Sequence, residues 1–83
     1  MDRVHLSDQS KRDLKKISFN EVKKIERQLL RLEKEPFSGK KLTGKLSGFY
    51  SLKAWPYRII YFIKEKQKEV WIISILHRQG AYK

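Results

Sequence analysis

The pattern of apolar and polar residues between positions 50 and 78 predicts three β-strands. Apolar and polar side chains alternate over 50–55 and again over 57–64, with a tight turn at Trp55-Pro56 between them, and a period of two is typical of half-buried strands. The more apolar parity should face the core, so Lys53 and Arg58 are expected together on the opposite, open face. A polar turn over 64–68 then precedes a strand over about 69–78, which is apolar on both faces and should lie inside the sheet.

Two helices are predicted before these strands. Apolar residues at spacings of three and four between positions 22 and 32 indicate an amphipathic helix over about 19–35, and Ser18 and Glu21 have the spacing of a capping box at its start. A shorter, mostly solvent-facing helix is expected over about 8–17, with Ser7 as its N-cap. Residues 3–6 form a candidate strand in front of it.

The order strand, helix, helix, strand, strand, strand favours the α+β class, because helices and strands do not alternate. We expect a helical hairpin packed on one face of a small, mostly antiparallel sheet, with the other face left for a ligand. A chain of 83 residues predicts one domain over 1–83. Residues 37–48 are rich in lysine and glycine and are expected to form a loop, either a solvated connector or a basic arm that contacts nucleic acid.

The charge of the chain narrows the choice of partner. Twenty Lys and Arg against nine Asp and Glu give a net charge of +11, which favours a polyanion, usually nucleic acid. An anionic membrane surface or an acidic protein would satisfy the same charge. The apolar stretch over 70–76 is far too short to span a bilayer, residues 1–6 lack the apolar region of a signal peptide, and the absence of cysteine fits a cytoplasmic protein.

No metal, cofactor or carboxylate site is predicted. The two histidines lie at opposite ends of the chain without spaced cysteine or carboxylate ligands, no GxSxG motif occurs, and nearly all acidic residues fall on helices or in turns. What is left is a basic constellation with one aromatic ring as the candidate catalytic set: Lys53, Arg58, His77, Arg78 and Tyr82.

These residue types suit the cleavage of RNA, which carries its own nucleophile, the 2′-hydroxyl. Arginine clamps a phosphate through two N–H groups, lysine acts as a base where neighbouring cations lower its pKa, histidine transfers protons near neutral pH, and aromatic rings stack on bases. Each residue also has a structural alternative, such as an exposed strand lysine, an arginine paired with an aromatic ring or a histidine at a strand end. Further contacts to RNA are predicted at Lys40, Lys41, Lys45, Ser51 and Trp55.

Four blocks of the sequence resemble the RelE/ParE superfamily of toxins from bacterial and archaeal toxin–antitoxin pairs. They are KLTGKL at 41–46, GFYSLK at 48–53, YRIIY at 57–61 and HRQGAYK at 77–83. The order of the elements fits as well, so the resemblance covers nearly the whole chain. It implies the compact, microbial-ribonuclease-like fold of these toxins and, as a partner, an antitoxin that wraps the toxin and masks its basic face.

The RelE branch implies metal-independent cleavage of messenger RNA in the ribosomal A site, with a 2′,3′-cyclic phosphate and a 5′-hydroxyl as the new ends. By this resemblance Lys53 would be base or electrostatic stabiliser, Arg58 would clamp the phosphate, Arg78 would stabilise or protonate the leaving oxygen, and Tyr82 would stack on a base, with His77 as the alternative proton donor. One position departs, because the best-studied enzymes carry a lysine where this chain has Ser51. Two alternatives stay open: a ParE-like toxin that poisons DNA gyrase, and a basic nucleic-acid-binding relative without catalysis.

Overall fold

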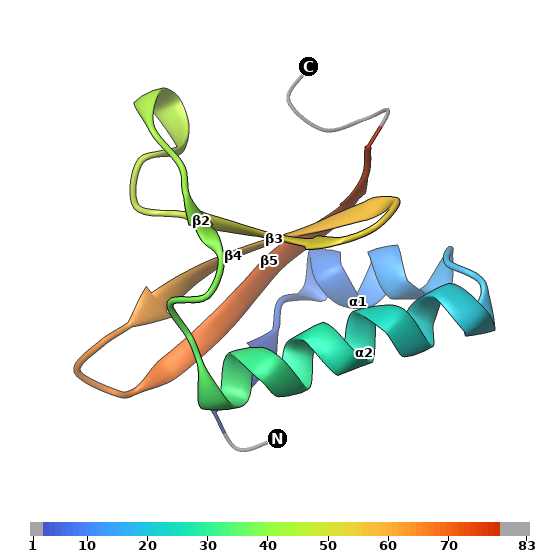
Figure 1. The fold of residues 1–83 in the computed structure, drawn as a ribbon, viewed down its shortest axis with the longest axis horizontal. Coiled ribbons are helices and arrows are strands. Elements are labelled where there is room, and N and C mark those ends of the chain that lie inside the picture. Colours follow the sequence, from blue (N-terminus) through green and yellow to red (C-terminus); the bar gives the residue numbers. More distant parts are fainter. Residues whose placement is uncertain (1–2, 79–83) are drawn as a thin grey trace.

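Five strands form one sheet in the order β1-β5-β4-β3-β2 in the computed structural model, which describes residues 3–78 (Figure 1). The strands are β1 (Val4–Leu6), β2 (Lys40–Lys41), β3 (Tyr50–Ala54), β4 (Tyr57–Lys64) and β5 (Glu69–His77). β1 pairs with β5 in parallel, and all other neighbours are antiparallel. The predicted α+β class and the mostly antiparallel sheet are confirmed. β5 lies inside the sheet as predicted, and β4 is its middle strand.

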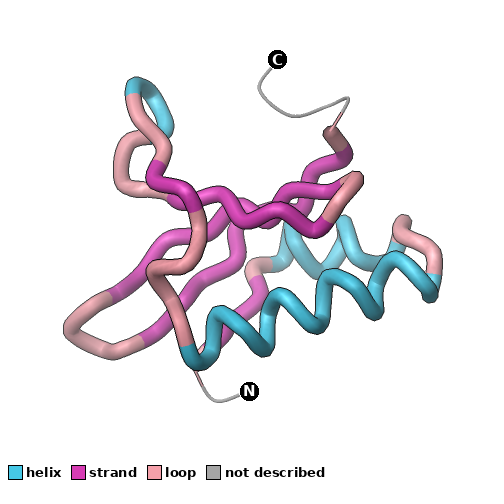
Figure 2. The backbone as a smooth tube through the Cα atoms, viewed as in Figure 1, coloured by secondary structure: helices cyan, strands magenta, loops and turns pink. Residues whose placement is uncertain are grey.

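Two helices, α1 (Asp8–Lys15) and α2 (Phe19–Lys34), cover one face of this sheet (Figure 2). α1 packs against β5 and α2 against β3. Ser7 caps α1 as predicted, since its Oγ accepts a hydrogen bond from the backbone N–H of Ser10 at 3.1 Å. The predicted capping box at α2 was wrong, because Ser18 makes no cap hydrogen bond and Glu21 instead contacts Lys24 at 3.3 Å. Within residues 3–78 neither helix is long and apolar enough to cross a membrane.

The core lies between α2 and the helix-facing side of the sheet. The apolar stripe of α2 supplies Ile25, Leu29 and Leu32, none of which is more than 2% exposed. β3 and β4 supply the parity that the alternation predicted, Leu52, Ala54, Ile59 and Tyr61. β5, which was predicted to be apolar on both faces, supplies Val70, Ile72 and Ile75. Residues of the other parity therefore point to the side of the sheet that the helices do not cover, which we call the open face.

The loop predicted over 37–48 was wrong in two places. Lys40 and Lys41 form the edge strand β2, which pairs with Ser51 and Tyr50 of β3, and Gly44–Leu46 form a 3₁₀ turn. A two-residue strand carries no hydrophobic period, so the sequence pattern could not reveal it. The pairing of β2 with β3 gives this polar segment backbone hydrogen-bond partners. It also brings Lys40 to the edge of the sheet.

A β-bulge in β5 decides which of its residues reach the open face. The register with β4 steps from Ile60–Ser74 to Tyr61–Ile72, so Ile73 has no partner on β4. Successive core residues of β5 are consequently three apart at this point, Ile72 and then Ile75, and the parity of every later residue is reversed. Arg78 therefore lies on the open face, and His77 lies on the side that faces the helices.

Two side chains from the start of the chain hold this bulge. The hydroxyl of Ser7 donates to the carbonyl of Ile73 at 2.8 Å, and the Asp13 carboxylate accepts from the backbone N–H of Ile75 at 2.9 Å. Both bonds fall on the part of β5 that the ladder leaves irregular. The bulge is therefore supported by α1 and its cap as well as by β4.

Replacing Asp13 by alanine is expected to destabilise the protein by about 1–3 kcal/mol, because the buried N–H of Ile75 loses its acceptor. Asp13→Asn keeps an acceptor oxygen and should lose less than half as much. Urea denaturation gives the free energies of unfolding, and hydrogen exchange of the Ile75 amide should accelerate selectively in the alanine variant. Equal exchange at Ile75 in both variants would contradict this role of Asp13.

Candidate functional site

Lys53 and Arg58 lie directly opposite each other on the open face. They are register partners across β3 and β4, and Arg58 is in turn the partner of Leu76 in β5. Directly opposed side chains of an antiparallel pair are neighbours, with Cβ atoms about 4.5–5.5 Å apart. We call this row, Lys53, Arg58 and Leu76, the first rung. The shared face that the alternation predicted for the two cations is confirmed.

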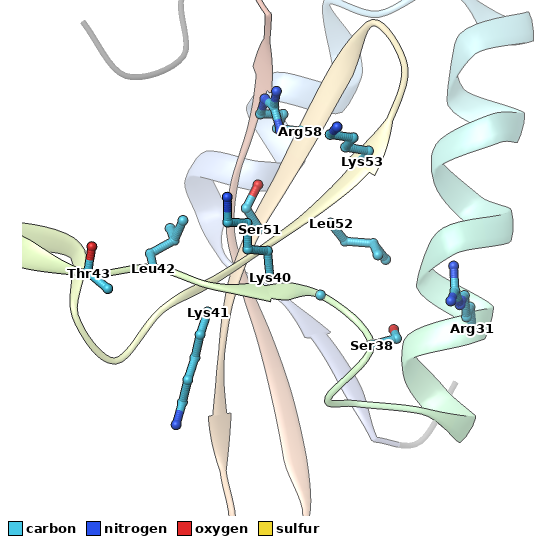
Figure 3. Close-up of a pocket in the computed structure, with 11 residues that line it drawn as sticks. Arg31, Ser38, Lys40, Lys41, Leu42, Thr43, Ser51, Leu52, Lys53 and Arg58 are labelled. Atoms are coloured by element: carbon cyan, nitrogen blue, oxygen red, sulfur yellow. The ribbon is translucent and has the colours of Figure 1, made fainter.

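The first rung borders a hollow of about 610 Å³ on the β2 side of the sheet (Figure 3). The residues that line it include five basic residues and no acidic one: Arg31, Lys40, Lys41, Lys53 and Arg58. The side chain of Lys41 points away from that of Lys40 (Figure 3). Cations gathered without a carboxylate repel one another, so the site gains free energy when an anion enters it. The hollow is suited to phosphate, and Arg31 on α2 is a contributor that the sequence pattern did not reveal.

Arg78 extends the cationic row past the end of β5. Its backbone N–H donates to the carbonyl of Pro56 at 2.8 Å, which continues the ladder beyond the strand. Its guanidinium lies 5.0 Å from the ring centroid of Trp55, a side chain that is 58% exposed. Cation–π contact thus holds Arg78 beside the β3–β4 turn and leaves much of the indole surface open for stacking. Tyr82, the remaining member of the predicted set, lies outside the described residues.

His77 is placed apart from the first rung. Its register partner is Tyr57, whose ring centroid lies 5.3 Å from that of the histidine, and both belong to the parity that faces the helices. The bulge in β5 causes this separation, because it reverses the parity of residues 76–78. The structure therefore groups Lys53, Arg58 and Arg78, and it does not bring His77 onto their face.

The predicted RNA-binding lysines diverge. Lys40 is the register partner of Ser51 and lines the hollow beside it, whereas Lys41 points away from Lys40. Lys45 is exposed on the 3₁₀ turn and does not line the hollow. Ser51 is only 6% exposed, and its Oγ has no hydrogen-bond partner among the described residues.

Tyr61 anchors the segment that leads into β2, a role that sequence reasoning missed. Its hydroxyl donates to the carbonyl of Pro36 and accepts from the N–H of Gly39, each at 2.9 Å. The side chain is fully buried, and burial raises the pKa of the Tyr61 hydroxyl above its usual range, partly offset by the Gly39 hydrogen bond. The hydroxyl therefore keeps its proton and its donor role near neutral pH.

Residues 3–78 contain no group of three His, Cys, Asp or Glu side chains close enough to hold a metal ion. The chemistry available to the site consists of cationic side chains, one hydroxyl and an aromatic surface.

Comparison with known proteins identifies the family to which this chain belongs. A family model described as the ParE toxin of type II toxin-antitoxin systems, parDE, matches residues 4–82. None of the curated proteins compared matches the sequence at a significant level.

Solved structures of related toxins share the fold. The toxin–antitoxin complex RelBE2 from Mycobacterium tuberculosis matches with a TM-score of 0.86 and 28% identity, over 92% of this chain and 96% of that one. The archaeal RelE–RelB complex from Pyrococcus horikoshii matches with a TM-score of 0.78 and 26% identity, over 92% and 93%. The isolated E. coli RelE toxin, at 18% identity and a TM-score of 0.77 over 90% and 82%, shares the fold alone. With the family model matching nearly the whole chain, this protein belongs to the RelE/ParE superfamily and is a toxin of a type II toxin–antitoxin system.

Proposed function

We propose that this toxin is an endoribonuclease that cleaves messenger RNA in the ribosomal A site. The observation that carries the proposal is the row of cations on the open face, in which Lys53 and Arg58 are cross-strand partners and Arg78 follows at the end of β5. A protein that bound a partner only by its overall charge would not need three cations aligned on one face beside a hollow without carboxylates.

The reaction requires the 2′-oxygen of a nucleotide to attack the adjacent phosphorus atom. The bond between phosphorus and the 5′-oxygen then breaks, which leaves a 2′,3′-cyclic phosphate and a 5′-hydroxyl. Water takes the proton of the 2′-hydroxyl, the Lys53 ammonium stabilises the negative charge that develops on the 2′-oxygen, and Arg58 donates two N–H groups to the non-bridging phosphate oxygens.

Arg78 stabilises the negative charge that develops on the leaving 5′-oxygen. Because an arginine side chain does not release its proton near neutral pH, the proton for this oxygen comes from water. The exposed indole of Trp55 offers a stacking surface for a base next to the cleaved bond. Tyr82 keeps its predicted stacking role as part of this proposal.

The proposal includes an antitoxin partner and a cytoplasmic site of action. Both RelBE2 and the archaeal RelE–RelB, compared above, are toxin–antitoxin complexes. The net charge of +11 suits both an antitoxin with an acidic segment over the open face and the RNA of the ribosome. The ribosome places the reaction in the cytoplasm.

Inhibition of DNA gyrase is the second candidate, since the matching family model is that of the ParE toxins. A gyrase inhibitor acts by binding to a protein and needs no aligned phosphate-binding cations. It predicts growth arrest with intact messenger RNA, and this arrest would survive removal of Arg78.

Translation of a defined messenger in vitro tests both candidates. The toxin should produce cuts in the A site that primer extension locates, with cyclic-phosphate ends, and Arg78→Ala should lower the cleavage rate about a hundredfold. Arg27→Ala, which removes an exposed arginine from α2, is the matched control and should cleave at the rate of the unchanged toxin. Intact messenger at toxin concentrations that stop cell growth would exclude the nuclease and favour gyrase.

A further inference from the structure

A second row of side chains crosses the open face beside the first rung. Lys40 of β2 is the register partner of Ser51 of β3, and Ser51 is the partner of Ile60 of β4. Directly opposed residues project from the same side of a sheet, so Lys40 and Ser51 share the face of the first rung. Figure 3 shows the two side chains together, below the pair formed by Lys53 and Arg58. We call Lys40 and Ser51 the second rung.

The Ser51 hydroxyl lacks an internal partner. Its side chain is more than nine-tenths buried, it lines the hollow, and its Oγ forms no hydrogen bond within the described residues. Buried hydroxyl groups in folded proteins nearly always form a hydrogen bond. A buried hydroxyl without one at the wall of a hollow therefore suggests that a ligand supplies the partner. An oxygen atom of an anion in the hollow would accept its proton.

Lys40 supplies charge to the same place. Lys40 is exposed, and neither of the ion pairs found within residues 3–78, His5–Glu69 and Glu21–Lys24, includes it. The second rung lies two residues along β3 from the first, a separation of about 6.8 Å. This is close to the distance between consecutive phosphorus atoms of an RNA strand, so the two rungs can contact neighbouring phosphates.

We propose that Lys40 and Ser51 form a second phosphate-binding subsite, which takes the phosphate next to the cleaved one on the same RNA strand. The lysine provides the charge and the hydroxyl donates a hydrogen bond to a phosphate oxygen. The subsite rests on the proposed function for its ligand class. With this subsite the toxin binds two consecutive phosphates, so it binds an RNA chain more tightly than a single phosphate group.

The position of the subsite depends on Tyr61. Its hydroxyl holds Pro36 and Gly39, and Gly39 immediately precedes Lys40. Lys40 is thus presented by an anchored edge strand. Lys66 is an exposed lysine in the turn between β4 and β5 and does not line the hollow, so it is a matched control of the same charge.

Binding of a short RNA whose 2′-hydroxyls are methylated, and which cannot be cleaved, tests the subsite by fluorescence anisotropy at several salt concentrations. Lys40→Ala should weaken binding about tenfold and reduce the slope of log K against log salt by about 0.7, the loss of one phosphate contact. Ser51→Ala should weaken binding about threefold without changing the slope, because a hydroxyl carries no charge. Lys66→Ala should stay within about twofold of the unchanged toxin.

Moving the charge across the rung gives the sharpest outcome. Ser51→Lys in the Lys40→Ala protein should restore both affinity and salt slope, since residue 51 lies directly opposite residue 40 on the same face. Lys40→Arg keeps the charge at position 40 and should retain both the affinity and the salt slope. If circular dichroism shows that the double variant is unfolded, Lys40→Arg serves as the test in its place.

Three results would overturn the subsite. They are equal losses in Lys40→Ala and Lys66→Ala, a folded double variant that binds as weakly as Lys40→Ala, and no binding of this RNA by the unchanged toxin at low salt. The proposed function is judged separately by cuts in the translated messenger. RNA binding with the Lys40 effect but without cleavage would refute the nuclease and leave the subsite intact.

Discussion

Replacing Arg58 by alanine is expected to lower the rate of messenger cleavage about a thousandfold and to abolish growth arrest. Arg58 belongs to the middle strand of the sheet, opposite Lys53, so its backbone is held on both sides by ladder hydrogen bonds. A fixed donor aimed at charge that develops in the transition state contributes about 10²–10³ in rate, and loss of the cation also weakens phosphate binding. The measurement is single-turnover cleavage of a programmed ribosomal messenger, with growth assays in parallel.

Two variants separate charge from geometry at this position. Arg58→Lys keeps the charge but loses the planar fork that contacts two oxygens, so it should retain less than a tenth of the activity. Arg27→Ala removes one positive charge from an exposed position on α2 and should be fully active. If the Arg58 and Arg27 variants were equally impaired, net charge would explain the activity and the role of the first rung would be refuted.

Replacing Gly39 by alanine is expected to destabilise the protein by about 3 kcal/mol, a fall in Tm of about 15 °C for a domain of this size. A Cβ at this position would collide with the hydroxyl of Tyr61, and it would lie 2.9 Å from Cε1 of that ring and 3.0 Å from the backbone oxygen of Ser51. The fully buried ring cannot move away without disturbing the core, and a displaced hydroxyl gives up its bonds to Pro36 and Gly39. Thermal and urea unfolding measure the loss.

Gly44→Ala is the matched control for this effect. Gly44 has a φ of 65°, and a Cβ there would meet no atom within 4 Å, so alanine should cost only about 1 kcal/mol of backbone strain. Tyr61→Phe removes the colliding hydroxyl, and combining it with Gly39→Ala should cost less than the sum of the two single changes. Additive losses would show that the contact with Tyr61 is not the cause.

Much of the first rung could be read from residues 50–61. A period of two, interrupted by a proline-containing turn, places Lys53 and Arg58 on one face whenever the apolar parity is buried, and the buried set includes Leu52 and Ile59 as that pattern requires. The stripe of α2 was readable for the same reason. In both elements the hydrophobic effect acts on a regular period, and one buried face determines the direction of every other side chain.

The sides of the sheet on which His77 and Arg78 lie depend on a bulge in β5. The two residues are adjacent, both suit proton or phosphate chemistry, and a strand that is apolar on both faces does not show which of them lies on the open face. The bulge that turns Arg78 to the open face is supported by hydrogen bonds from Ser7 and Asp13, 66 and 62 residues from their partners along the chain. No local sequence pattern predicts a hydrogen bond between residues so far apart in the chain.

Local sequence therefore determined the class of the fold, the parity of β3 and β4, and the excess of positive charge. Tertiary structure decided that Arg78 and not His77 joins Lys53 and Arg58, and that Lys40 lies opposite Ser51. The physical reason is the same in both cases. Burial of apolar side chains requires a regular hydrophobic period, which is visible in the sequence. A bulge and a two-residue edge strand are instead positioned by backbone hydrogen bonds and by single contacts between residues far apart in the sequence, such as the contact of Tyr61 with Gly39.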